Sequence, residues 1–204
     1  MARRFGLLPV SSENQSIKNP FAGWFTTGNF GIFVICAGIY AAGSLGLPEV
    51  SVVSITEQLG LSIALNTPSD LFIIMPGVLL VPFIALFGFP AVIGITLGHL
   101  VISTTSVVGS IALFSPIFTF IGLATVRYGG ITGIFLKKPN ILVGIAGYVM
   151  ITSVWLSYVA VSLTGVGFGS VLLVAILSKI FPISVGFIFY LIVNRLGLFS
   201  KTSS

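Results

Sequence analysis

Residues 169–193 read GSVLLVAILSKIFPISVGFIFYLIV, a run in which Lys179 is the only charged side chain. A membrane-spanning helix needs about 20 mostly apolar residues, because each adds about 1.5 Å across a hydrocarbon core about 30 Å thick. This run is long enough to span. We identify five further candidate runs, at residues 29–47, 71–87, 91–108, 111–126 and 141–163. The sequence therefore predicts an all-α integral membrane protein, built as a bundle of six transmembrane helices.

The composition of the whole chain also favours lipid as its solvent. Of its 204 residues, 56% are hydrophobic and 6% are charged, against about 25% charged in ordinary soluble domains. So few charged side chains cannot cover the surface of a soluble fold. The length suits one bundle, which we divide into a cytoplasmic segment at 1–27, a transmembrane domain at 28–195 and a cytoplasmic tail at 196–204.

The basic residues predict the orientation. With six spans, every lysine and arginine except Lys179 falls on one side of the membrane, which the positive-inside rule assigns to the cytoplasm. We therefore expect both termini in the cytoplasm and the chain in the cell membrane. Because topology explains the basic charge, we expect no nucleic-acid partner. Residues 48–69 hold Glu49 and Glu57 but no basic residue, so this loop is expected outside, either as a lid or as a plain connector.

Few residues support enzyme chemistry. The chain has one histidine, His99, one cysteine, Cys36, and no carboxylate inside a predicted span. A nucleophile–histidine–acid set would have to use Asp70 at the rim, and no Gly-x-x-x-x-Gly-Lys phosphate loop is present. A lone histidine and a lone cysteine are also a poor start for a metal site. We expect no catalytic residue, metal or cofactor.

Lys179 is the most informative polar residue. It lies about ten residues, or roughly 15 Å, below the outer end of its predicted helix. A charge at that depth costs at least about 2.5–3.5 kcal/mol, so the side chain is expected to face the bundle interior. Two interpretations stay open. The ammonium meets an anionic group of a ligand, or it pairs within the chain with Asp70, Glu57 or carbonyl groups freed by Pro182.

Two polar stripes are predicted to reach the same outer half of the bundle as Lys179. One stripe contains His99 and Ser103, four residues apart on the third helix. The other contains Tyr148, Thr152 and Trp155, at spacings of four and seven residues on the fifth helix. An apolar pocket with a few polar groups is typical of a ligand site. The candidate substrate-binding residues are His99, Ser103, Tyr148, Thr152, Trp155 and Lys179. For Ser103 and Thr152 taken singly, hydrogen bonding between or within helices is the favoured alternative.

Small residues form a further pattern. Ala37 and Ala41 are four apart on the first predicted helix, and Gly94 and Gly98 are four apart on the third. Such pairs let helix backbones approach closely in lipid. Packing within the bundle is the simpler explanation, and docking of another subunit is the alternative.

These features together resemble the substrate-binding S component of energy-coupling-factor vitamin transporters. The resemblance covers residues 30–128 and includes the Ala-x-x-x-Ala pattern of Ala37 and Ala41, followed by a long outer loop. Residues 86–99, LFGFPAVIGITLGH, resemble the Gly-Pro-x-x-x-x-Gly-x-x-x-Gly-Asn stretch of queuosine-precursor-type members. Here Phe89 intervenes before the proline, and His99 stands where asparagine is usual.

The resemblance implies a function. An S component captures a vitamin or related nutrient outside the cell and delivers it inward by toppling against a partner transmembrane subunit, while cytoplasmic ATPases drive the cycle. It implies that Ala37 and Ala41 dock on that partner, and that the outer loop and last helices bind the small-molecule substrate. Two other classes stay open: a non-catalytic structural subunit of a larger membrane complex, and a membrane sensor domain. Binding of a small molecule by the isolated protein would favour the S-component function over both of these classes.

Overall fold

The fold is helical, with one short pair of strands. The computed structural model describes residues 27–46, 50–51, 72–73, 77–105, 110–134, 139–165 and 167–195. The elements are α1 (Thr27–Gly46), β1 (Val50–Ser51), β2 (Phe72–Ile73), α3 (Gly77–Phe87), α4 (Phe89–Thr105), the 3₁₀ helix η1 (Ser110–Phe114), α5 (Ser115–Ala124), the π-helix η2 (Thr125–Ile131), α6 (Ile141–Thr164) and α7 (Phe168–Arg195). The segments predicted at 1–27 and 196–204 lie almost wholly outside the described residues.

Three of these helices are long and apolar enough to cross a membrane. They cover Thr27–Leu45 in α1, Ile141–Leu163 in α6 and all of α7. The apolar helices α3 and α4 are shorter, and the fourth predicted run is divided among η1, α5 and η2. The prediction of a helical fold is confirmed, and three helices suit a membrane by length and composition. The count of six spans stays a prediction.

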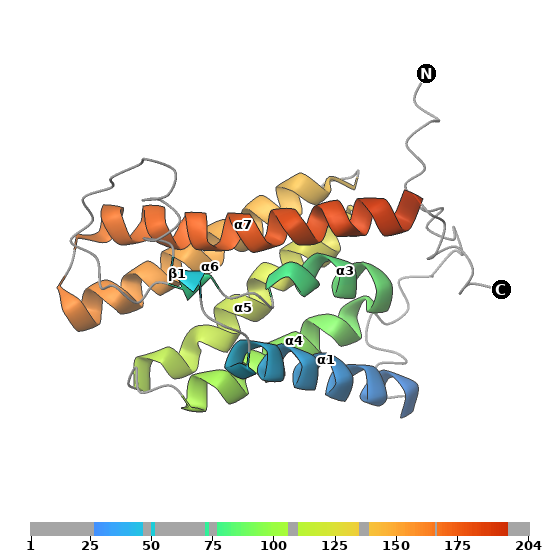
Figure 1. Cartoon of the computed structure of the whole chain (residues 1–204), viewed down its shortest axis with the longest axis horizontal. Coiled ribbons are helices and arrows are strands. Elements are labelled where there is room, and N and C mark those ends of the chain that lie inside the picture. The colour runs from blue at the N-terminus through green and yellow to red at the C-terminus, as the bar shows by residue number, and fades with distance from the viewer. Residues whose placement is uncertain are drawn as a thin grey trace, which may run out of the picture.

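The helices form one bundle in which α6 and α7 pack side by side and α1 lies at the opposite edge (Figure 1). α1 packs chiefly on α4, while α3 packs on α7 and α5 lies between α4 and α6. α1 begins and α7 ends at the same end of the bundle (Figure 1). The arrangement gathers all six α-helices around one interior.

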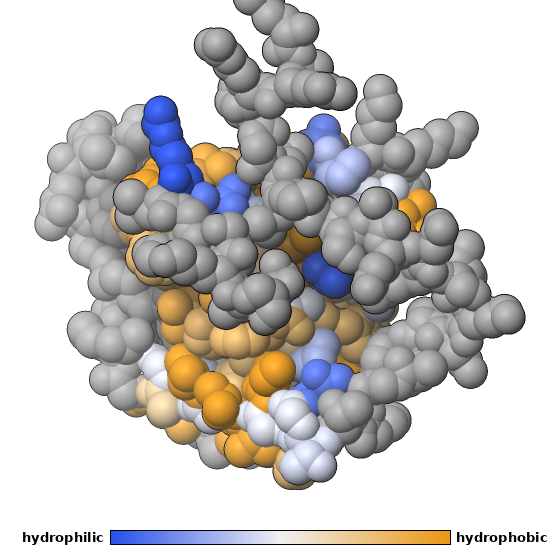
Figure 2. All heavy atoms as spheres, turned by 90° about the vertical axis from the view of Figure 1, so that its right-hand side faces the viewer, coloured by the Kyte–Doolittle hydropathy of each residue, from blue (hydrophilic) through white to orange (hydrophobic). Residues whose placement is uncertain are grey.

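The exterior of the bundle is apolar. Large side chains are more than half exposed on the first and last helices, among them Phe30, Val34, Ile188 and Phe189. Soluble monomers rarely expose contiguous apolar patches above a few hundred Å², so this surface suits lipid. Figure 2 views the end of the bundle where α1 begins, and there hydrophilic side chains lie among the apolar ones.

The second predicted helix is shorter than expected. We predicted helix over residues 71–87, but α3 begins at Gly77, and Phe72 and Ile73 of β2 pair antiparallel with Ser51 and Val50 of β1. Pro76 has no N–H and disfavours helix in the residue before it, which explains a start just beyond it. The pairing ties the chain after α1 to the chain before α3, and β2 contacts α7.

Two glycines that lie between the fourth and fifth predicted runs belong to a helix and form a helix contact. We placed Gly129 and Gly130 between the fourth and fifth helices, but both are buried inside η2. A β-carbon on Gly144 of α6 would lie 2.8 Å from the Gly130 Cα atom. The absence of side chains therefore lets η2 and α6 approach at backbone distance.

The turn between α3 and α4 contains a glycine with a required conformation. Gly88 has φ +65°, and a β-carbon there would lie 3.2 Å from an Arg127 guanidinium nitrogen. L-residues disfavour this left-handed region, so glycine permits the tight connection between α3 and α4. The contact also places Arg127 of η2 beside this turn.

Candidate functional site

A cavity of about 110 Å³ lies where the six described α-helices converge. Each contributes at least one lining side chain, so the cavity exists only in the assembled bundle. Its lining consists of Tyr40, Gly77, Leu80, His99, Ser115, Phe118, Thr119, Tyr148, Thr152, Trp155, Leu156, Ser178, Lys179, Pro182 and Ile183. A mostly apolar cavity with a few polar groups has the composition of a small-molecule site.

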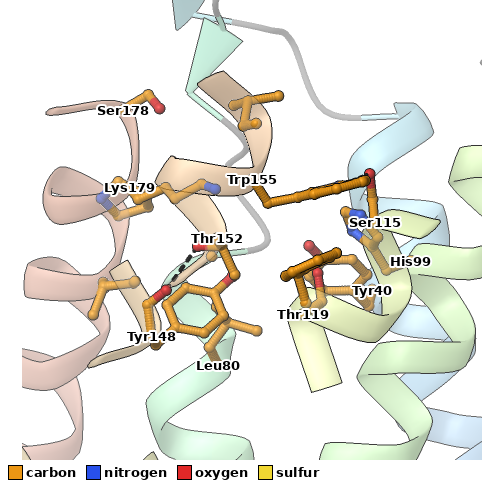
Figure 3. Close-up of a pocket in the computed structure, with 15 residues that line it drawn as sticks. Tyr40, Leu80, His99, Ser115, Thr119, Tyr148, Thr152, Trp155, Ser178 and Lys179 are labelled. Atoms are coloured by element: carbon orange, nitrogen blue, oxygen red, sulfur yellow. Dashed lines mark hydrogen bonds between the residues drawn. The ribbon is translucent and has the colours of Figure 1, made fainter. Parts of the chain in front are cut away.

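The structure brings together five of the six predicted substrate-binding residues. His99, Tyr148, Thr152, Trp155 and Lys179 all line the cavity. Figure 3 shows Lys179 extending from α7 toward Trp155 and Thr152, with His99 on the opposite side. The helical spacing that grouped these residues in the sequence thus corresponds to a real face in the fold.

Ser103 is the sixth, and it is not among the lining residues. Its hydroxyl donates to the His99 carbonyl oxygen one turn earlier, at 2.9 Å. Ser103 is on the same side of α4 as His99, but one helical turn is about 5.4 Å, and the cavity does not extend that far. This bond within its own helix is the alternative that the sequence favoured for Ser103.

Two stacked aromatic rings form one wall of the cavity. The rings of Phe118 and Trp155 lie 4.0 Å apart between centroids, with an interplanar angle of 10°. The Trp155 indole N–H donates to the Ser115 hydroxyl oxygen at 2.9 Å. This bond joins α6 to α5 and fixes the orientation of the indole.

Lys179 supplies the positive charge of the cavity. It lies 11 residues after the first residue of α7, about 16 Å at 1.5 Å per residue. All four carboxylates of the chain, Glu13, Glu49, Glu57 and Asp70, lie outside the described residues. The pairing of Lys179 with Glu57 or Asp70 is therefore untested, and the described part of the bundle offers the ammonium no carboxylate.

His99 faces Tyr40 across a ring-centroid distance of 6.2 Å, with the planes at 45°. Its Nδ1 atom is buried and has no hydrogen-bond partner in the described part of the chain. A buried polar atom without a partner costs free energy unless something binds it. His99 therefore has a polar atom whose hydrogen-bond partner the described residues do not supply, and the residue lines the cavity.

Two hydroxyl groups of the lining are already used as donors. Thr152 donates to the Tyr148 carbonyl oxygen at 2.8 Å, and Ser178 donates to the Ala175 carbonyl oxygen at 2.9 Å. Each bond lies within one helix, as the sequence suggested for Thr152. These oxygens can still accept a hydrogen bond, but they have no hydrogen left to donate to an anion.

Several residues that line the cavity were not predicted from the sequence. Ser115 and Thr119 are four apart on α5, and Tyr40 faces inward from α1. The same spacing rule that grouped Tyr148 and Thr152 would have found the α5 pair. Phe118 gave no such signal, because a phenylalanine in an apolar helix does not distinguish core from cavity.

The small residues of α1 divide between two faces. Ala37 and Ala41 are half-buried, and the Ala37 carbonyl oxygen would lie 2.7 Å from a β-carbon on Gly98 of α4. The backbone of Ala37 therefore packs within the bundle. Gly38 and Ala42, one position further along, are exposed.

The described lining of the cavity offers hydrogen-bonding and aromatic groups to a bound molecule. Within the described ranges there is no group of three or more His, Cys, Asp or Glu side chains, and the cavity holds no carboxylate that could serve as a base. No known family model, curated protein or solved structure matches the chain. Function must therefore be inferred from the cavity itself.

Proposed function

We propose that the protein is the membrane-embedded substrate-capture subunit of an importer for a small nutrient, such as a vitamin or its precursor. The observation that carries the proposal is Lys179 in the cavity, without a carboxylate from the described part of the bundle. Keeping a charge inside a membrane protein is expensive, and such residues commonly mark substrate pathways. His99, whose Nδ1 atom has no hydrogen-bond partner among the described residues, lines the same cavity.

The proposal includes six spans, with both termini in the cytoplasm of a cell-membrane protein. Each of the six predicted apolar runs contains helix. Because α1 begins and α7 ends at the same end of the bundle (Figure 1), an even number of crossings is favoured. The exposed Arg195 in the last turn of α7 is expected on the cytoplasmic side.

Labelling from outside the cell tests this topology. Single cysteines at Ser54 and Ser203, in a Cys36→Ala background, should differ in their reaction with a membrane-impermeant maleimide on intact cells. Ser54→Cys should react, whereas Ser203→Cys should react only after the cells are permeabilised. Labelling of Ser203→Cys on intact cells would contradict the six-span model.

The proposal also includes partners, because the sequence has no phosphate loop with which to use ATP. A second transmembrane subunit and cytoplasmic ATPases would supply the energy. The outer face of α1 suits docking of that subunit. It presents Gly38 and Ala42 beside the half-buried Ala41, and small residues allow close helix contact in lipid.

A blocked cavity tests capture. We expect a small molecule to co-purify with the protein and to be identified by mass spectrometry after denaturation. Thr152→Trp places a large ring in the cavity and should reduce its occupancy at least ten-fold. Val154→Trp, on the lipid-facing side of α6 where Val154 is 43% exposed, is the matched control and should retain the molecule. Equal occupancy in both variants would place the bound molecule elsewhere.

A further inference from the structure

The charge of the cavity limits the kind of ligand. Among the described residues of its lining, Lys179 is the only formally charged one, and the neutral His99 carries the other titratable nitrogen. Thr152 and Ser178 have committed their hydroxyl hydrogens to backbone carbonyls. Among the described lining residues, the Lys179 ammonium is therefore the one charged donor for an anionic group, beside the neutral hydroxyl groups of Tyr40, Ser115, Thr119 and Tyr148. A ligand with a single negative charge makes the occupied cavity neutral.

The size of the cavity limits the ligand further. Its volume is about 110 Å³. For comparison, an engineered apolar cavity of about 150 Å³ in another protein binds benzene. The space beside Lys179 is of comparable size and partly open, so one six-membered ring is about the largest group that it can enclose.

The wall of the cavity favours a flat ring. Phe118 and Trp155 are stacked and both line the space, while Tyr40 and Tyr148 add two further aromatic side chains. Aromatic groups gain from offset-stacked and edge-to-face contacts beyond the area that they bury. The hydrogen bond from Trp155 to Ser115 holds this wall in place before a ligand arrives, so little ordering cost is left for binding.

From these observations we propose that the ligand is a single-ring aromatic carboxylate, with its carboxylate on Lys179 and its ring against Phe118 and Trp155. This inference rests on the proposed capture function and specifies its substrate class. Lys179 extends toward Trp155 across the cavity (Figure 3), so the two contacts can be made by one small molecule. His99, on the far side, is available to a polar atom on the ring.

Titrations of the purified full-length protein test the substrate class. The chain has two tryptophans, so a Trp24→Phe background leaves Trp155 as the only indole and as a reporter of the cavity. The probes are benzoate, 4-hydroxybenzoate and pyridine-3-carboxylate, each compared with its amide, together with cyclohexanecarboxylate. At least one acid should change Trp155 fluorescence saturably. Its amide should bind at least ten-fold more weakly, and the alicyclic acid at least three-fold more weakly than benzoate.

Binding of a labelled acid by equilibrium dialysis gives an independent measurement. Trp155→Leu should weaken the best acid at least five-fold, whereas Phe189→Leu should leave its binding unchanged because Phe189 is exposed and does not line the cavity. Amides that bind as tightly as their acids, or acids that bind equally well without Trp155, would overturn the inference.

The failure of this inference can be separated from failure of the proposed function. If none of the acids binds, but the Thr152→Trp variant loses a co-purified molecule of another class, the substrate class is wrong and capture stands. If none of the acids binds and nothing co-purifies in a cavity-dependent way, both are wrong.

Discussion

Protein with leucine at Gly94 should fail to accumulate in folded form, whereas protein with leucine at Gly38 should accumulate normally. A β-carbon on Gly94 would lie 2.6 Å from the Phe33 carbonyl oxygen and 2.8 Å from the Cys36 β-carbon. Backbone atoms cannot move aside as a flexible side chain can. We expect a cost of at least about 3 kcal/mol, at or above the upper end of ordinary overpacking. That is a large fraction of a typical folding free energy of about 5–15 kcal/mol.

Gly38 is the matched control because it lies on α1, away from the interface with α4. It is exposed, and a β-carbon there would meet no atom within 4 Å. Leucine is a better helix former than glycine by up to about 1 kcal/mol, so Gly38→Leu should be neutral or stabilising. The measurement is the yield of monodisperse protein in detergent, with its temperature of half-aggregation. Equal stability of the two variants would show that α1 does not pack on α4 as described.

The α1–α4 interface also shows what the sequence could not predict. Ala37 with Ala41, and Gly38 with Ala42, are equally good small-residue pairs at the same spacing. Consecutive residues differ by about 100° around a helix, so one pair faces α4 while the other is exposed. Nothing local distinguishes them. Which pair packs on α4 depends on where Gly94 and Gly98 lie in the tertiary structure.

The cavity was more predictable than the interface. Ionisable residues are rare in apolar helices, so His99 and Lys179 could be assigned to the interior from the cost of placing them in lipid. Helical spacing then grouped Tyr148, Thr152 and Trp155 correctly on one face. Spacing does not say where a cavity ends along a helix, and for that reason Ser103 was included although it lies one turn too far. The pairing of β1 with β2 involves two residues per strand, too few to leave a pattern in the sequence.

Replacing Lys179 with methionine should separate ligand binding from stability. Methionine keeps the length of the side chain and removes its charge. If Lys179 binds the anionic group of a ligand, the loss of a charge-assisted hydrogen bond, about 1.5–3 kcal/mol, should weaken binding ten-fold or more. Ligand-free Lys179→Met protein should be as stable as the wild type or more stable, because a buried charge without a partner has been removed. Ligand affinity and thermal stability are measured on the same preparations.

Arg195→Met provides the control for the loss of one positive charge from α7. Arg195 lies in the last turn of the same helix and is exposed, so its replacement should change neither affinity nor stability appreciably. A change of similar size in both variants would point to a general effect of net charge on an anionic ligand. The ten-fold loss is expected for Lys179→Met alone.

A structural ion pair would give the opposite pattern. If Lys179 pairs with Glu57 or Asp70, removing the ammonium strands a carboxylate, and breaking a buried pair in this way costs about 3–5 kcal/mol. Lys179→Met would then be destabilised, and Glu57→Gln or Asp70→Asn would partly restore its stability. Unchanged ligand affinity together with that rescue would refute the binding role. The two roles predict opposite signs for the stability change. An unpaired charge destabilises the ligand-free protein, so its removal is stabilising, whereas removal of one partner of an ion pair is destabilising.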